Sequence, residues 1–360
     1  MNVGLIGCGF IGKKHAKSIA SAHDIRLRAV CDTETDRAAE LRRYYASLTQ
    51  DPLEIESYQF YESLLENPQL DTIAITVPSG LHYRIAREAL LRGKHVVLEK
   101  PMTLSLIEAR SLIQIAETRQ RKLIVCHQKR FFPHLRSIKG LMDRRGLGRV
   151  VTASLSLMYN RNDNYYNQSA WRGTWKMDGG VLLNQAIHDI DILLWLTGQP
   201  RTVQGFVERL IRPIEAEDTA AAAIVLENGT LLTIDATVCA TEGTSREAVA
   251  VTGSAGAFVL EGKNLKPTYW NVPGVEEPVV SAVDPYAQLY QDVHDSIYNN
   301  CPPLVEAVEA VTALETIFAI YRSSVLEKAV TLPLNTMSTL IMKDKLQRRA
   351  AVRCQGPKVT

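Results

Sequence analysis

The sequence predicts an α/β fold, in which a doubly wound parallel sheet is followed by an α+β domain with a large, mostly antiparallel open sheet. Three observations predict it. The 360 residues exceed what one hydrophobic core usually holds. The first part of the chain alternates strand and helix patterns, which is typical of parallel sheets with right-handed crossovers. Beyond residue 126, strand patterns follow one another with turn signals between them, as in antiparallel sheets.

Composition restricts the class of protein and its partners. The 41 Lys and Arg against 39 Asp and Glu give a net charge of +2, so neither nucleic acid nor an anionic membrane is an expected partner. No apolar run approaches the roughly 20 residues of a membrane-spanning helix, and glycines interrupt the apolar N-terminus, so no signal peptide is expected. The six scattered cysteines form no C-x-x-C pair, which argues against structural zinc and favours a cytoplasmic protein.

The N-terminal domain is predicted over residues 1–126. Its strands are short, continuously apolar runs that suit a sheet covered on both faces, at residues 3–6, 27–31, 71–77, 95–98 and 123–126. Apolar spacing predicts a helix before Gly93, which stands where a left-handed cap belongs. Ser105 and Glu108 have the spacing of a capping box that starts another helix.

The second domain is predicted over residues 127–340. A polar, aromatic loop over 160–180 leads into an apolar helix over 181–196, and several strand patterns follow between 202 and 280. The other elements expected here are helices at 135–145, 286–299 and 304–328 and a strand at 150–159. The tail 341–360 is basic and is interpreted as a solvated helix face.

A glycine-rich loop follows the first strand. Gly7, Gly9 and Gly12 fit G-x-G-x-x-G, in which the first glycine permits a tight turn, the second lets a pyrophosphate approach and the third allows close helix packing. Asp32 ends the second strand, where an acid can bond a ribose 2′-hydroxyl and would repel a 2′-phosphate. The pattern predicts a Rossmann dinucleotide site with NAD favoured over NADP, although the nearby Arg37 tempers that preference. The alternative is a tight turn beside a solvated Asp.

Two further segments end neighbouring strands, at residues 78–82 and 99–101. Ligands of open α/β sheets gather at the carboxyl ends of the strands. Lys100 follows an apolar strand directly, where partial burial or a nearby cation would lower a lysine pKa towards a catalytic range. The alternative is an ordinary surface lysine in a turn.

Several motifs together resemble the glucose–fructose oxidoreductase / inositol dehydrogenase / MocA (Gfo/Idh/MocA) family. They are the glycine loop, T-V-P-S-G-L-H (76–82), G-K-H-V-V-L-E-K-P (93–101), R-F-F-P (130–133) and D-G-G-V-L-L-N-Q-A-I-H-D-I-D (178–191). The resemblance implies catalytic roles for Lys100 and His188. It also implies an NAD site formed by Gly7, Gly9, Phe10, Ile11, Gly12, Asp32, Val77, Pro78, His82, Glu99, Lys100 and Gln128.

One position departs from the family pattern. Many members carry Asp four residues before the histidine, and this chain has Asn184. An amide cannot accept a proton, but it can hydrogen-bond a substrate hydroxyl. The surrounding N-Q-A-I-H and S-A-W-R-G-T-W segments resemble the branch of UDP-N-acetylglucosaminuronate 3-dehydrogenases. Inositol or another polyol is the alternative substrate.

The helix over 181–196 independently favours a site. Asn184, His188 and Asp191 stand at i, i+4 and i+7, a polar stripe on a nearly all-apolar helix, and buried polar groups need partners. A sugar would supply them; the alternative is a satisfied core network. A metal site is not expected, because no other ligand cluster has suitable spacing.

The loop over 160–180 combines aromatic rings with cations and amides. Aromatic faces pack on sugars while cations bind carboxylate or phosphate, so the loop is expected to bind substrate through Tyr165, Trp171, Arg172 and Lys176. The same loop also contains the aromatic residues Tyr166 and Trp175 and the cation Arg161. A structural edge or oligomer contact is the alternative. By analogy with the family, a homodimer or homotetramer is expected.

The sequence therefore predicts an NAD(H)-dependent oxidoreductase that moves a hydride between nicotinamide and a secondary hydroxyl of a sugar or nucleotide-linked sugar. His188 is expected to be the base, with Lys100 as a relay and a positioned cation, and Asn184 is expected to orient the hydroxyl. A protein of another class, a dinucleotide-binding sensor or scaffold without turnover, is the alternative; the presence of both Lys100 and His188 argues against it.

Overall fold

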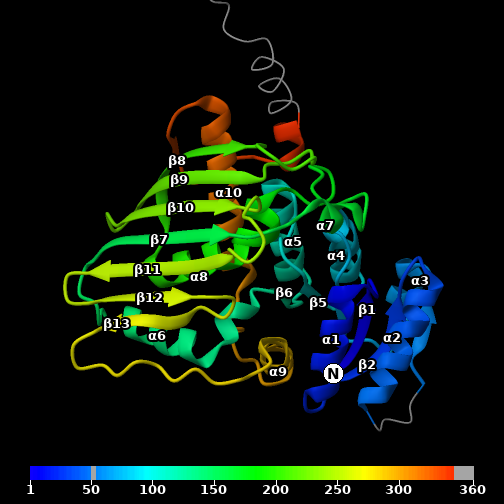
Figure 1. Ribbon diagram of the computed structural model, residues 1–360. Helices are drawn as coiled ribbons and strands as arrows, with labels where there is room; N and C mark the ends of the chain where they lie inside the picture. The colour runs from blue at the N-terminus through cyan, green and yellow to red at the C-terminus, as the bar shows by residue number, and fades with distance from the viewer. Residues whose placement is uncertain (50–53, 344–360) are drawn as a thin grey trace, which may run out of the picture. The chain divides into compact units, whose positions relative to one another are not determined.

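The computed structural model describes residues 1–49 and 54–343 (Figure 1). The chain forms two compact units. Unit 1 contains Met1–Thr103, Glu108–Phe132 and Ala282–Val311, and unit 2 contains Leu104–Ile107, Pro133–Ser281 and the chain from Thr312 on. The basic tail expected at 341–360 lies outside the described residues from position 344 onward.

Unit 1 is built on a six-stranded sheet in the order β3-β2-β1-β4-β5-β6, with every pairing parallel. Its strands are β1 (Asn2–Ile6), β2 (Arg26–Cys31), β3 (Glu56–Tyr58), β4 (Thr72–Ile75), β5 (His95–Leu98) and β6 (Leu123–Val125). All residues of β4 and β6 are buried, as continuous apolar runs covered on both faces should be. This confirms the parallel doubly wound sheet; β3, which is short and polar, carried no strand pattern and was missed.

Helices follow the strands of unit 1 in sequence. They are α1 (Phe10–Ser21), α2 (Thr35–Leu48), α3 (Tyr61–Glu66), the 3₁₀ turn η1 (Ser79–Leu81), α4 (His82–Leu91), α5 (Leu106–Thr118), the 3₁₀ turn η2 (Gln128–Phe131) and α9 (Pro285–Tyr298). The α9 helix comes from a part of the chain expected in the second domain. Asp284 caps α9 through the backbone N–H of Tyr286 and accepts a hydrogen bond from Ser18 of α1, which ties α9 to this unit.

Unit 2 is built on an eight-stranded sheet in the order β13-β12-β11-β7-β10-β9-β8-β14 (Figure 1). Its pairings are antiparallel apart from β7 with β10, so the mostly antiparallel sheet is confirmed. The strands are β7 (Val150–Met158), β8 (Pro200–Glu208), β9 (Thr219–Leu226), β10 (Leu231–Thr237), β11 (Arg246–Gly253), β12 (Ala257–Glu261), β13 (Lys266–Asn271) and β14 (Val330–Thr331).

Helices cover one face of this sheet. They are α6 (Pro133–Asp143), the π-helical turn η3 (Leu182–Ala186), α8 (Ile187–Thr197) and the part of α10 (Ala307–Leu326) that lies in unit 2, while α7 (Asp163–Asn167) is a short helix in the loop before η3. Along β10, Leu232, Ile234 and Ala236 are buried, whereas Leu231 is exposed. This alternation leaves an open outer face. None of the helices within the described ranges is long and apolar enough to span a bilayer.

Candidate active site

The strands of unit 1 place the expected cofactor residues along one sheet edge. Because all six strands are parallel, Gly7, Asp32, Thr76, Glu99 and Cys126 each follow a strand end on the same side. The strand order reverses between β1 and its neighbours β2 and β4, and this switch point is where open α/β sheets bind ligands. We call this set of strand ends the carboxyl edge.

The three glycines of the loop differ in what surrounds them. Gly7 has φ +100° and a Cβ there would lie 2.8 Å from the Thr76 carbonyl, so a side chain is excluded both by conformation and by space. A Cβ on Gly12 would lie 2.2 Å from the Gly7 carbonyl oxygen, where α1 packs closely. A Cβ on Gly9 would meet nothing within 4 Å among the described residues. Gly9 thus faces open space, as the glycine beside a pyrophosphate must.

Asp32 is fixed by backbone hydrogen bonds. One carboxylate oxygen accepts from the N–H of Cys8 in the glycine loop at 2.8 Å, and the other accepts from the N–H of Glu34 at 2.9 Å. The carboxylate remains partly exposed, so its other lone pairs can accept from ribose hydroxyls. This geometry fits the role expected for Asp32.

The first turn of α1 is suited to an anion. Among the described residues, no side chain caps this helix start at Gly9, so the first N–H groups are available to phosphate oxygens. Phe10 opens the helix with a 73% exposed side chain, and Ile11 is partly exposed. Both therefore lie at the surface beside the loop.

His82 bridges two of the strand-end turns. It is 1% exposed, with Nδ1 2.8 Å from the carbonyl oxygen of Pro101 and Nε2 2.9 Å from that of Val77. Burial lowers the pKa of His82 although both carbonyls favour the protonated ring. Because both ring nitrogens have hydrogen-bond partners, we expect His82 to affect cofactor binding only by positioning these two turns, which carry Val77, Pro78 and Lys100.

Glu99 lies in a hydrogen-bonded network that the sequence did not reveal. The Glu99 carboxylate is 3.0 Å from His15 Nε2 and accepts from the Tyr286 hydroxyl at 2.8 Å, while Tyr290 lies 2.7 Å from His15 Nδ1. Burial works against ionisation, but the hydrogen bond and charge interaction with His15, together with Lys100 and Tyr286, lower the pKa of Glu99 to about 2. The backbone N–H of Lys100 donates to Glu99 at 3.1 Å, so this buried anion anchors the turn that carries Lys100.

Three buried residues in and beside this network are close enough to one another to hold a metal ion. Ligand atoms of His15, Glu99 and Cys126 lie within 4.8 Å of one another. Both nitrogens of His15 already have hydrogen-bond partners, and burial raises the pKa of the Cys126 thiol well above its usual range. A protonated thiol beside an occupied imidazole suits a hydrogen-bond network better than a metal. At the neighbouring strand end Gln128 is partly exposed, and its amide oxygen is buried with no hydrogen-bond partner among the described residues.

In unit 2, the helix expected over 181–196 is not uniform. Leu182–Ala186 is a π-helical turn and the α-helix α8 begins only at Ile187. Asn184 lies in the π turn and His188 in the first turn of α8, so the segment between them is not the plain α-helix that the sequence predicted. Both side chains are partly exposed, whereas Asp191 is 2% exposed. π-helical turns are rare and often occur at functional sites.

Asn184 is oriented by three neighbours. Its amide nitrogen donates to Asp178, and its oxygen accepts from Gln185 and, at 3.4 Å, from the Tyr165 hydroxyl. Asp178 also accepts from the Gly173 N–H at 2.8 Å. A carboxylate only accepts hydrogen bonds, so Asp178 fixes which end of the amide faces it. Asp178 and Gln185 were not anticipated as partners of Asn184.

A second buried carboxyl lies at the start of this helix. Glu217 is fully buried and accepts from the Leu182 N–H at 3.0 Å and from the Tyr321 hydroxyl at 2.8 Å. Its other oxygen has no hydrogen-bond partner among the described residues and lies against Gly180, where a Cβ would come within 2.2 Å of it. Burial raises the pKa of Glu217 to about 7. No local pattern marks Glu217, because Tyr321 is far along the chain.

The aromatic loop divides between surface and core. Tyr165, Trp171 and Arg172 are partly exposed and lie together, with the Arg172 guanidinium 4.2 Å from the Tyr165 ring centre and 4.9 Å from the Trp171 ring centre. Lys176 is exposed. Trp175, however, is 1% exposed and packs edge-on against Tyr321. Trp175 is therefore a core residue, unlike the partly exposed Trp171 of the same loop.

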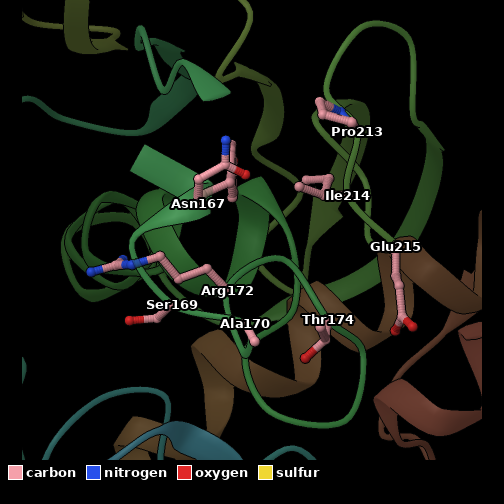
Figure 2. A pocket seen from close by; sticks show the side chains of 9 residues that line it. Asn167, Ser169, Ala170, Arg172, Thr174, Pro213, Ile214 and Glu215 are labelled. Atoms are coloured by element: carbon pink, nitrogen blue, oxygen red, sulfur yellow. The ribbon is translucent and has the colours of Figure 1, made fainter. Parts of the chain in front are cut away.

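Figure 2 shows a hollow beside this loop, with a volume of about 340 Å³. Loop residues form one side and residues 213–215 the other. The lining mixes polar and apolar groups: Tyr166, Asn167, Ser169, Ala170, Arg172, Thr174, Pro213, Ile214 and Glu215. Of the residues predicted to bind substrate, this hollow includes Arg172.

Two family models match the chain. The model described as "Oxidoreductase family, NAD-binding Rossmann fold" matches residues 1–127, and the model described as "GFO/IDH/MocA C-terminal domain" matches residues 135–259. Together they cover well over half of the chain.

Curated proteins and solved structures agree with these matches. The chain is 29% identical over 278 residues to an uncharacterized oxidoreductase of Synechocystis (74% of this chain, 73% of that one). It is 29% identical over 237 residues to the UDP-N-acetylglucosamine 3-dehydrogenase of Acidithiobacillus ferrooxidans, covering 66% of each. The WlbA dehydrogenase of Bordetella pertussis, solved in complex with NADH and UDP-GlcNAcA, superposes with a TM-score of 0.85 at 27% identity, covering 93% of this chain and 98% of that one.

Proposed function

This chain belongs to the Gfo/Idh/MocA oxidoreductase family, and its N-terminal domain is an NAD-binding Rossmann fold. From that premise we propose that it oxidises a secondary hydroxyl of a sugar or nucleotide-linked sugar. The observation that carries the proposal is the carboxyl edge. There the open space at Gly9, the uncapped start of α1 and the fixed Asp32 carboxylate meet the requirements of a dinucleotide.

The residues proposed to hold the cofactor each contribute a different contact. Gly7, Gly9 and Gly12 let the pyrophosphate reach the N–H groups of Phe10 and Ile11, and Asp32 accepts from the adenosine ribose. Val77, Pro78 and Gln128 follow neighbouring strands and are proposed to line the same cofactor, while His82 and Glu99 support these turns. When bound, NAD supplies the hydride acceptor.

The chain's own residues handle the proton and the charge. We assign His188 to take the proton of the substrate hydroxyl, because imidazole titrates near neutral pH. Lys100 stabilises the alkoxide that develops on the oxygen and can relay the proton. Asn184, oriented by Asp178, donates to or accepts from the same hydroxyl. Tyr165, Trp171, Arg172 and Lys176 remain proposed substrate contacts. Asp191, which the sequence also predicted to bind substrate, is buried, and we propose that it supports the helix instead.

The substrate class rests on the relatives. A nucleotide-linked sugar is favoured because the A. ferrooxidans relative is named for UDP-N-acetylglucosamine and the WlbA structure contains UDP-GlcNAcA. An inositol or polyol is the second candidate. The observation behind it is a 26% identity over 264 residues to an inositol 2-dehydrogenase of Rhizobium meliloti.

A homodimer or homotetramer in the cytoplasm completes the proposal. Phe206, Leu231 and Val151 are large apolar side chains exposed on strands of the unit 2 sheet, and apolar surface of this kind often marks an interface. Within the described ranges all five cysteines are free, which suits a reducing compartment. Light scattering of the purified protein tests the oligomeric state; a monomer at working concentration would reject it.

Turnover separates this proposal from a sensor or scaffold that binds NAD without chemistry. Protein and NAD are mixed anaerobically with UDP-N-acetylglucosamine, its uronate and myo-inositol in turn, and NADH absorbance is followed. We expect NADH with a nucleotide sugar and none with the Lys100→Met variant. NADH from myo-inositol alone would select the polyol alternative. No NADH from a wider sugar panel, with NAD binding intact, would favour the sensor.

A further inference from the structure

Two arginines of unit 2 share one tyrosine ring. The Arg161 guanidinium carbon lies 4.7 Å from the Tyr165 ring centre and that of Arg172 lies 4.2 Å from it. Arg161 also lies 5.3 Å from the Tyr159 ring, and Arg172 4.9 Å from the Trp171 ring. Two guanidinium groups that contact one ring concentrate positive charge there, and this arrangement favours an anion nearby.

The described part of the chain pairs neither arginine with a carboxylate, although Asp178 is near enough to act on the Tyr165 hydroxyl. Arg161 donates to the Gln185 side chain at 2.9 Å, and the Nε atoms of both arginines are buried without a hydrogen-bond partner among the described residues. Neither forms an ion pair with a described carboxylate, whereas Arg212 lies 3.8 Å from Asp163 and Arg246 2.9 Å from Glu261 in the same unit. Contact with aromatic rings offsets only part of the charge of a guanidinium and satisfies none of its donors in the ring plane.

The position of the pair relates it to the proposed substrate. The hydroxyl of Tyr165, whose ring both cations contact, lies 3.4 Å from Asn184 Oδ1, and Gln185 connects Arg161 to Asn184. A group held by both arginines would therefore lie beside the amide proposed to contact the substrate hydroxyl. Figure 2 shows Arg172 pointing away from Glu215, the acid on the far side of the hollow, and Glu215 itself pairs with Lys343 at 3.6 Å.

We infer that Arg161 and Arg172 bind an anionic group of the substrate, a carboxylate or a phosphate. The inference rests on the proposed function, and it narrows the substrate class to uronates, phosphosugars or nucleotide-linked sugars and away from neutral polyols. Planar guanidinium groups suit both anions because each presents paired N–H donors.

Binding of defined probes tests the inference. The NAD-loaded protein is titrated by calorimetry with glucuronate, UDP, inorganic phosphate and neutral glucose. Glucuronate distinguishes a carboxylate site, and UDP or phosphate a phosphate site. We expect at least one anionic probe to bind about tenfold or more tightly than glucose, a difference equal to one charged hydrogen bond.

Variants then locate the site. Arg172→Gln and Arg161→Gln should each weaken the anionic probe by about 10- to 100-fold and leave glucose unchanged. Arg246→Gln removes the same charge from an exposed pair of the same unit and should leave all probes unchanged. Arg161→Lys and Arg172→Lys keep the charge and serve if a Gln variant unfolds; they should lose less affinity than Gln, since a lysine lacks the paired donors.

Two results would overturn the inference. One is glucose binding as tightly as every anionic probe; the other is a Gln variant that binds the anionic probes as Arg246→Gln does. The proposed function fails separately. Anion binding that depends on both arginines, without NADH from any anionic sugar, would reject dehydrogenation and keep the anion site. NADH from an anionic sugar at equal rates in wild type, Arg161→Gln and Arg172→Gln would reject the anion site and keep the dehydrogenase.

Discussion

The carboxyl edge of unit 1 and the segment 160–188 of unit 2 form their candidate sites by opposite means. At the carboxyl edge the essential atoms belong to the backbone, and glycines create the room. Gly9 faces open space and Asp32 is held by two backbone N–H groups. In the segment 160–188 side chains hold one another, as when Asp178 and Gln185 orient Asn184. A site formed by backbone atoms can be predicted from the local sequence, whereas a site formed by side chains depends on how distant residues pack together.

The two buried glutamates, one in each unit, differ in the direction of their pKa shifts. Glu99 in unit 1 has three donors, and their effect lowers its pKa to about 2. Glu217 in unit 2 leaves one oxygen without a partner among the described residues, and burial raises its pKa to about 7. Comparable burial therefore accompanies very different pKa values, because Glu99 faces His15 and Lys100 as well as more donors, whereas Glu217 lies near the carboxylate of Asp178.

The largest effect should follow from Lys100→Met. Turnover should fall below detection while NAD affinity stays within a few-fold, because Lys100 is proposed to stabilise the alkoxide and not the pyrophosphate. Steady-state rates and NAD titration check both parts. Lys122→Met, a partly exposed lysine of the same unit, is the control and should remain active. Near wild-type activity in Lys100→Met would remove Lys100 from the chemistry.

His188→Ala should lower the turnover rate by roughly 10²–10⁴-fold, the usual range for a positioned acid–base group. It should also flatten the acid limb of the pH–rate profile, because an imidazole must be neutral to accept the proton. His23→Ala, at an exposed position of unit 1, should leave the profile unchanged. If the acid limb persists in His188→Ala and disappears in Lys100→Arg, the base is Lys100.

Glu217→Gln should change how stability depends on pH. The carboxyl binds its proton more tightly in the folded chain than in the unfolded one, so wild-type stability is complete below about pH 4.5 and declines as pH rises to about 7. The decline is at most about 1.4 kcal/mol per pH unit. Gln cannot ionise and should lack this slope. Denaturant unfolding at several pH values measures it, and parallel slopes in the two proteins would contradict the raised pKa.

Asn184→Ala should weaken substrate binding by about 1–3 kcal/mol, the effect of one lost buried hydrogen bond, and keep the acid limb of the pH–rate profile.

Asn184→Asp should behave differently, because it would place a second carboxyl against Asp178. The pair should share a proton, so this variant should fold and bind best at acid pH and weaken as pH rises. Substrate affinity measured across pH separates the two variants; an Asp variant that binds equally at all pH values would show that Asp178 does not orient the amide.

The smallest effect is expected for Asp32→Ser. Wild type should prefer NAD, because the fixed carboxylate repels a 2′-phosphate, and the variant should narrow the difference between NAD and NADP. Calorimetry with both cofactors measures the ratio. Tighter NADP than NAD binding by wild type would show that Arg37, and not Asp32, sets the preference.

The sequence predicts unit 1 well because its signals are local. Apolar runs mark five of the six strands, and the glycine spacing marks the loop within a few residues. The polar strand β3 could not be predicted, because its residues carry no apolar pattern. The network around Glu99 could not be predicted because His15, Tyr286 and Tyr290 are distant in sequence and meet only in the folded unit.

The sequence predicts unit 2 less completely because packing overrides local pattern there. The period of the residues before His188 indicates a continuous α-helix, but the chain forms a π turn over Leu182–Ala186 whose first N–H groups are held by Glu217. Loop composition alone does not distinguish the buried Trp175 from the partly exposed Trp171. Contacts made across the sheet decide both outcomes.

Isotope transfer tests the central claim most directly. A nucleotide-linked sugar that gives NADH in the anaerobic assay is prepared with deuterium on the carbon of the reacting hydroxyl, and wild-type protein is mixed with it and unlabelled NAD. The account predicts that mass spectrometry finds one deuterium in the reduced nicotinamide and none in the solvent, with no transfer in Lys100→Met. Reduced cofactor without deuterium, or deuterium released to water, would contradict direct hydride transfer from a sugar hydroxyl carbon.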